Sequence, residues 1–204
     1  MALTTYSGLQ DTIASYLGRS DLTSQIPGFI SLAEVRMARD LRIRQMLQTV
    51  TASTAAGDST VGLPSDFLEI RDLFVDGNPK TRLQYVSPSA FSADQRSSLS
   101  GQPQIYTMRG LEFEFAPTPD FDYTIQMLYY ANPEPLSSLV PSNVFLSVAP
   151  DALLYGSLAE AEPYLMNDAR IQTWATLYLN AIDKISTSDD RAEYSGVPIV
   201  MKIS

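Results

Sequence analysis

The spacing of apolar residues changes twice along this chain, so neither an all-helical nor an all-strand fold accommodates it. Near each end, apolar residues recur every three or four positions, as the buried face of a helix requires. Between residues 48 and 131 they alternate with polar residues in short runs bounded by turn residues, which is typical of strands. This order predicts an α+β protein in which both chain ends form one helical bundle and a small antiparallel β subdomain is inserted between its halves.

The change in spacing also predicts four segments. Residues 1–47 are expected to form the first half of the helical bundle, residues 48–131 the inserted β subdomain, and residues 132–193 the second half of the bundle. Residues 194–204 are expected to form an extended C-terminal tail.

Two helices are predicted in the first segment. Leu9, Ile13 and Leu17 recur at four-residue spacing, and Gly18 is suited to end that helix. The second helix begins near Ile26-Pro27, because proline fits a first helical turn, and runs to about Arg42.

The second half of the bundle is predicted to follow a proline-containing loop over residues 132–149. Residues 151–159 are apolar almost all round, so we expect a helix that neighbouring elements bury, with Pro163 stopping or kinking it. A longer helix begins at Asn167 or Asp168, and Trp174 and Tyr178 are expected in the core.

The strand-like runs of the middle segment predict hairpins. Residues 48–53 and 60–63 flank one turn, and residues 67–75 and 83–86 flank another. Residues 88–91 suit a single helical turn. The remaining predicted strands are 105–108, 111–115 and 123–130.

The absence of cysteine and histidine limits the chemistry of this chain. Thiol nucleophiles, disulfides, imidazole metal ligands and the commonest general base are all missing, so an enzyme is disfavoured and no cofactor is expected. The Glu112/Glu114 pair shares a strand face, as the two carboxylates of a glycosidase could, but ordinary polar strand faces have this spacing too.

A net charge of -9 argues against tight binding of nucleic acid. No apolar run suits a membrane span and no secretory signal is visible, so we expect folding in the cytoplasm.

The C-terminal tail is unusually apolar for a chain end. We predict that it docks in extended form on a neighbouring subunit or another protein, although folding back on its own bundle is the alternative. The residues of this docking tail are Tyr194, Val197, Pro198, Ile199, Val200, Met201 and Ile203.

Four arginines lie close together in the sequence, at Arg36, Arg39, Arg42 and Arg44. They could line a DNA channel or take part in subunit contacts. Helical geometry places Arg39 and Arg42 opposite the apolar face and Arg36 near its edge, one turn before Asp40. Because the four do not form one stripe, a solvated face or a subunit contact is favoured over phosphate binding.

The sequence resembles the head-to-tail adaptor (connector) proteins of tailed bacteriophages, including podovirus-type portal adaptors. The similarity rests on the order and spacing of several motifs along nearly the whole chain. These motifs are Asp21–Glu34, Leu63–Glu69, Gly101–Tyr106, Tyr129-Tyr130 and Tyr155–Ala161.

The resemblance implies a virion structural protein at the head–tail interface, assembled in the host cytoplasm. Such proteins form a ring, usually of twelve subunits, that binds the portal protein and offers a docking surface to the tail nozzle or tail fibres. Double-stranded DNA passes through the ring without sequence recognition, and no membrane or cofactor is involved. The alternative is a carbohydrate-binding tail module that contacts the host surface, which requires exposed rings among Tyr85, Tyr106 and Tyr123. A virion glycosidase ranks third.

Overall fold

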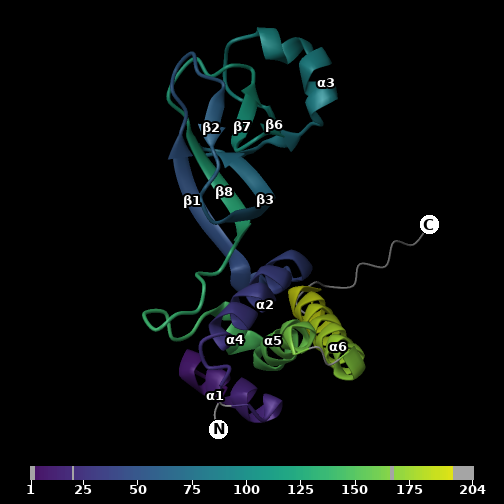
Figure 1. The fold of residues 1–204 in the computed structure, drawn as a ribbon. Helices are drawn as coiled ribbons and strands as arrows, with labels where there is room; N and C mark the ends of the chain where they lie inside the picture. Colours follow the sequence, from purple (N-terminus) through teal and green to yellow (C-terminus); the bar gives the residue numbers. More distant parts are fainter. Residues whose placement is uncertain (1–2, 20, 166–167, 195–204) are drawn as a thin grey trace, which may run out of the picture. The chain divides into compact units, whose positions relative to one another are not determined.

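The computed structural model of the chain describes residues 3–19, 21–165 and 168–194. The described residues form two compact units (Figure 1). The helical unit combines the chain up to Met46 with the chain from Pro133, and the β unit spans Leu47–Asn132. The predicted α+β class, with helices from both chain ends and strands between them, is confirmed. Of the predicted extended tail over residues 194–204, the structure describes only Tyr194, which is the last residue of a helix and not part of an extended segment. The rest of the tail lies outside the described residues.

The helical unit begins with two helices whose ends follow from local sequence. Helix α1 (Tyr6–Leu17) is capped by Thr5, whose hydroxyl oxygen accepts the backbone N–H of Gly8 at 3.2 Å. Gly18 ends α1 with φ 64°, a conformation that glycine adopts without steric cost. Helix α2 (Ile26–Asp40) carries proline in its first turn, as predicted.

The second half of the unit contains α4 (Val144–Val148), α5 (Pro150–Tyr164) and α6 (Asp168–Tyr194). Helix α5 packs against both α2 and α6 and is buried on most of its circumference, as its apolar sequence predicts. At Gly156, helix α5 lies very close to both α2 and α6. A Cβ at this position would lie 3.2 Å from the Cβ of Ala33 and 3.3 Å from the ring of Tyr178.

The loop predicted over residues 132–149 is wrong in its last part, because α4 lies there. Asn143 caps α4 by accepting the backbone N–H of Leu146 at 3.1 Å. Phe145 and Leu146 are both buried. A helix of five residues is too short to show a helical repeat, so the cap was its only local signal.

The β unit contains two four-stranded sheets. The first has the order β1 (Leu47–Ser53), β8 (Thr124–Ala131), β3 (Phe67–Val75), β4 (Thr81–Arg82). The second has the order β2 (Thr60–Gly62), β7 (Glu112–Ala116), β6 (Ile105–Arg109), β5 (Gln84–Tyr85). The short helix α3 (Pro88–Ala93) follows β5, where the sequence predicted a helical turn.

The first predicted hairpin is wrong, although its two strands exist. β1 pairs along its whole length with β8, whereas β2 pairs with β7 in the other sheet. The second hairpin is only partly correct. β3 does form a hairpin, but its partner is β4 at residues 81–82 and not the predicted 83–86. The chain changes sheets at Leu83, and β5 pairs with β6 in parallel. The predicted antiparallel arrangement holds for every other strand pair in the described β unit.

The two sheets enclose a shared apolar core. Phe113 lies at its centre, fully buried, with the rings of Phe67, Tyr106 and Phe115 around it at centroid distances of 5.9, 5.8 and 6.4 Å. The Phe67 and Tyr106 rings meet Phe113 edge to face, an arrangement that adds to the stabilisation from burial. The first sheet contributes most of the other buried members, among them Leu73, Ile125, Met127 and Tyr129.

Candidate assembly surfaces

The four arginines of the basic cluster have different surroundings in the helical unit. The Arg36 guanidinium lies 4.4 Å from the ring centroid of Tyr178 and forms ion pairs with Glu160 at 3.5 Å and Asp40 at 3.9 Å. It thereby joins α2 to α5 and α6. The predicted proximity of Arg36 to Asp40 is confirmed.

Arg42 and Arg44 are also engaged within the subunit. Arg42 donates to the backbone carbonyl oxygens of Ala38 and Leu41 at 2.7 and 2.8 Å. Arg44 pairs with Asp189 of α6, with its backbone N–H at 3.0 Å and its Nε at 2.9 Å from the carboxylate. The Asp189 carboxylate thereby holds residue 44 against α6.

Arg39 differs from the other three. Its Nε donates to the backbone carbonyl of Val35 at 3.3 Å, and its side chain is exposed. Within the described part of the chain it pairs with no carboxylate. It is therefore the member of the cluster with a charge available for another molecule.

A buried carboxylate fixes the junction of α1, α5 and α6. Glu162 accepts the indole N–H of Trp174 at 3.0 Å, and the Trp174 ring stacks on Tyr155 and meets the edge of Tyr16. The second carboxylate oxygen of Glu162 has no hydrogen-bond partner among the described residues. Trp174 and Tyr178 pack within the bundle, as predicted, and burial raises the pKa of Tyr178, whose hydroxyl donates to Asp40.

Another buried carboxylate, Glu34, attaches the segment before α4 to α2. Its Oε1 accepts the backbone N–H of Leu136 at 3.0 Å and the amide of Asn143 at 2.7 Å. Burial raises the pKa of Glu34, while these two hydrogen bonds oppose the rise. Because Asn143 also caps α4, one carboxylate on α2 positions both the segment and the start of the next helix. Sequence reasoning missed Glu34, which occupies a position on the buried side of α2.

We expect Glu34→Gln to make stability less dependent on pH. The folded protein binds this proton more tightly than the unfolded chain does, because the folded pKa is raised. The contribution of Glu34 to stability is therefore largest below its ordinary pKa of 4.5 and falls as pH rises through the folded pKa. Glutamine keeps an acceptor oxygen but carries no charge. Urea unfolding of both proteins across this interval should show wild-type stability falling relative to the variant as pH rises.

A matched variant separates charge from hydrogen bonding. Glu34→Ala leaves the N–H of Leu136 and the amide of Asn143 without their acceptor, which should cost about 1–3 kcal/mol at every pH. A constant stability difference between wild type and Glu34→Gln over the whole interval would contradict the assignment.

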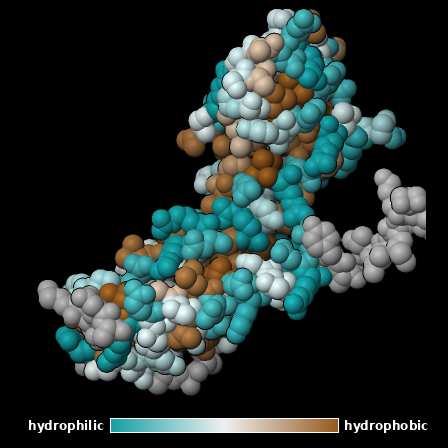
Figure 2. Space-filling model, turned by 90° about the vertical axis from the view of Figure 1, so that its right-hand side faces the viewer, coloured by the Kyte–Doolittle hydropathy of each residue, from teal (hydrophilic) through white to brown (hydrophobic). Residues whose placement is uncertain are grey.

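Several large apolar side chains of the helical unit face outward. Leu32 and Val35 on α2 are each 53% exposed, and Leu179 on α6 is 57% exposed. Figure 2 shows apolar patches that interrupt the hydrophilic surface on one face of the molecule. Single exposed apolar residues are common, whereas contiguous exposed apolar patches mark association surfaces. These residues were not predicted to form a contact, although the spacing of Leu32 and Val35 is visible in the sequence.

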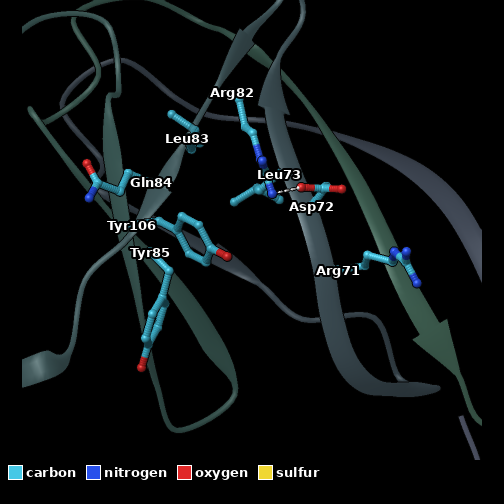
Figure 3. A pocket seen from close by; sticks show the side chains of 8 residues that line it. All are labelled: Arg71, Asp72, Leu73, Arg82, Leu83, Gln84, Tyr85 and Tyr106. Atoms are coloured by element: carbon cyan, nitrogen blue, oxygen red, sulfur yellow. Dashed lines mark ion pairs between the residues drawn. The ribbon is translucent and has the colours of Figure 1, made fainter. Parts of the chain in front are cut away.

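The aromatic residues of the carbohydrate-binding alternative are only partly available. A cavity of about 340 Å³ in the β unit is lined by Tyr85 and Tyr106 and by the Asp72–Arg82 ion pair, while Arg71 points away (Figure 3). Tyr85 is 50% exposed, but Tyr106 is only 5% exposed. Tyr123 does not line this cavity, and its hydroxyl donates to Asp120. The stacking surface that this alternative requires is reduced to Tyr85.

The described part of the chain can also be compared with what metal binding, glycosidase chemistry and membrane insertion require. It contains no cluster of three or more acidic residues suited to a metal ion. Glu114, one of the pair considered for glycosidase chemistry, forms an ion pair with Arg109 at 3.1 Å. None of the helices in the described ranges is both long enough and apolar enough to cross a bilayer.

Comparison with known proteins identifies the family of the chain. No curated protein matches the chain. The sequence profile of the SU10 adaptor protein family matches residues 4–201, which covers the helical unit, the β unit and most of the C-terminal tail. The chain belongs to the SU10 adaptor protein family, whose members are structural head-to-tail adaptors of bacteriophages.

Proposed function

We propose that this protein forms a ring beneath the portal of its phage, extends the DNA channel and provides the docking surface for the tail nozzle or tail fibres. The family match over residues 4–201 is the observation that carries this proposal. The outward apolar residues of α2 and α6 support it, as does Arg39, which pairs with no carboxylate among the described residues. A ring requires such surfaces to bind other subunits.

The acidic balance of the chain fits passage of DNA rather than its retention. With 23 acidic and 14 basic residues, the protein repels phosphate at long range. Arg36 and Arg44 are paired with carboxylates within the subunit, which reduces what the basic cluster can offer to DNA. We assign the cluster to contacts within and between subunits rather than to the channel wall.

The C-terminal tail is the proposed contact with the portal or with a neighbouring subunit. Its apolar residues Val197, Ile199, Val200, Met201 and Ile203 follow α6 directly in the sequence. In a ring, each subunit presents one copy of this tail, so contacts that are weak singly add through multivalency. Loss of the tail should therefore weaken attachment to the portal far more than loss of one contact in an isolated pair.

Removal of residues 195–204 tests the role of the tail. Full-length protein mixed with the purified portal of the same phage should comigrate with it in a density gradient, whereas the truncated protein should remain at the top. A full-length control with Ile199→Ser, Met201→Ser and Ile203→Ser separates chain length from apolar contact and should behave like the truncation. If both variants comigrate with the portal as wild type does, the tail is not the attachment, even if the protein is an adaptor.

A further inference from the structure

Helix α2 presents a continuous stripe on the side opposite its core. Gly28, Leu32, Val35 and Arg39 are spaced four, three and four positions apart, and all four are exposed. This spacing keeps residues on one side of a helix. The buried side of α2 faces the bundle, so the stripe points out of the helical unit. It is apolar in its middle and basic toward the C-terminal end of α2.

Helix α6 carries a second stripe with the same spacing. Gln172, Thr176, Leu179 and Asp183 follow each other at four, three and four positions, and all are exposed. Asp190 continues the stripe two turns later and is exposed as well. Neither acidic residue forms an ion pair within the described part of the chain. This stripe has Leu179 in its middle and is acidic toward the C-terminal end of α6.

The two stripes match each other in register and in charge. Laid side by side in parallel, they place Val35 against Leu179 and Arg39 against Asp183. The four-three spacing is the one by which helices pack side chains into each other's grooves. Each helix uses its opposite side to pack on α5, and among the described residues no ion pair joins one stripe to the other.

We infer that α2 of one subunit docks in parallel on α6 of the next copy of this chain, through Leu32, Val35 and Arg39 on one side and Thr176, Leu179 and Asp183 on the other. This inference rests on the proposed ring and specifies its subunit contact. The contact joins two different surfaces of the same protein, so it repeats from copy to copy and closes into a ring when the rotation allows. Apolar burial supplies attraction, and the Arg39–Asp183 pair fixes the register.

Cysteine crosslinking provides a direct test, because the natural chain contains no cysteine. A Val35→Cys/Leu179→Cys double variant, assembled on the portal and mildly oxidised, should give a ladder of covalent oligomers on a non-reducing gel. Each single variant alone should give none, and an equal mixture of the two should give crosslinked dimers. The matched control is Val35→Cys/Leu177→Cys, because Leu177 lies on another side of α6, and it should give no ladder.

Charge reversal gives an independent readout that needs no oxidation. Arg39→Glu and Asp183→Arg should each raise the protein concentration needed for assembly by about tenfold or more, because like charges then meet at every contact. An equal mixture of the two variants restores an opposite-charge pair at each contact and should assemble as alternating subunits. Arg191→Glu has the same charge change as Arg39→Glu, lies off the α6 stripe, and should assemble like wild type.

The outcomes separate this contact from the function on which it rests. If wild type assembles on the portal but the double cysteine variant gives no ladder and the charge mixture fails, the α2–α6 contact is wrong and the adaptor function stands. A single Val35→Cys variant that crosslinks to itself would overturn the head-to-tail arrangement in favour of a symmetric α2–α2 contact. If wild type does not assemble at all, the proposed ring fails and this inference fails with it.

Discussion

Replacement of Phe113 by alanine is expected to lower the free energy of unfolding by about 3–5 kcal/mol. Phe113 is fully buried, and three aromatic rings surround it where the two sheets meet. Removal of its ring leaves a cavity that strands paired on both sides cannot collapse to fill. Urea unfolding followed by circular dichroism measures the loss, and hydrogen exchange should locate it in β6, β7 and β8.

Phe121→Ala is the control for that experiment. It removes the same ring from a position in the β unit that is 67% exposed, so stability should change by no more than about 0.5 kcal/mol. If the two alanine variants lose equal stability, Phe113 does not occupy the centre of the core.

Gly156→Leu is expected to disrupt the helical unit, with a loss of about 3 kcal/mol or more. Even a Cβ at this position would come within 3.4 Å of Ala33 and Tyr178, so a full side chain must separate α5 from both neighbouring helices. Tyr178 cannot move freely, because its hydroxyl donates to Asp40 and Arg36 lies over its ring. The chain has one tryptophan, Trp174, and its fluorescence reports unfolding of this unit.

Gly28→Leu supplies the comparison for Gly156→Leu. Both glycines lie in helices, but a Cβ at Gly28 meets nothing within 4 Å. Leucine there should leave stability unchanged or raise it by up to about 1 kcal/mol through helix propensity. Destabilisation of similar size in both variants would mean that the close packing at Gly156 is not the cause.

The parts of the fold that are determined by residues close together in the sequence could be predicted. The ends of α1 follow from Thr5 and Gly18, and the buried character of α5 follows from a run that is apolar on nearly every side. The hairpin at Arg109-Gly110 was also predictable, because alternation and a turn residue with φ 62° lie together in the chain.

Strand partners that are distant in sequence could not be predicted in the same way. β1 has a nearby turn and a nearby strand, yet it pairs with β8, whose residues lie more than seventy positions away in every pair. An alternating pattern shows that a residue lies in a strand, but it does not identify the neighbour that accepts its backbone hydrogen bonds. For this reason the first predicted hairpin was wrong and the change of sheet at Leu83 was missed.

The contacts of the candidate assembly surfaces also fall into two groups, those predictable from local sequence and those between residues distant in the chain. Helical geometry correctly indicated that the four arginines do not form one stripe. It could not indicate that Arg44 contacts Asp189 or that Glu34 holds Leu136, because both contacts join residues more than a hundred positions apart. The docking role of the C-terminal tail remains a prediction, since residues 195–204 lie outside the described part of the chain.

The most direct test of the adaptor function is cryo-electron microscopy of the head–tail vertex of the phage that encodes this protein. We predict a ring of density directly beneath the portal into which the helical unit and the β unit each fit, with a channel wide enough for duplex DNA. Absence of such a ring, or location of the protein in the tail fibres instead, would contradict the adaptor function.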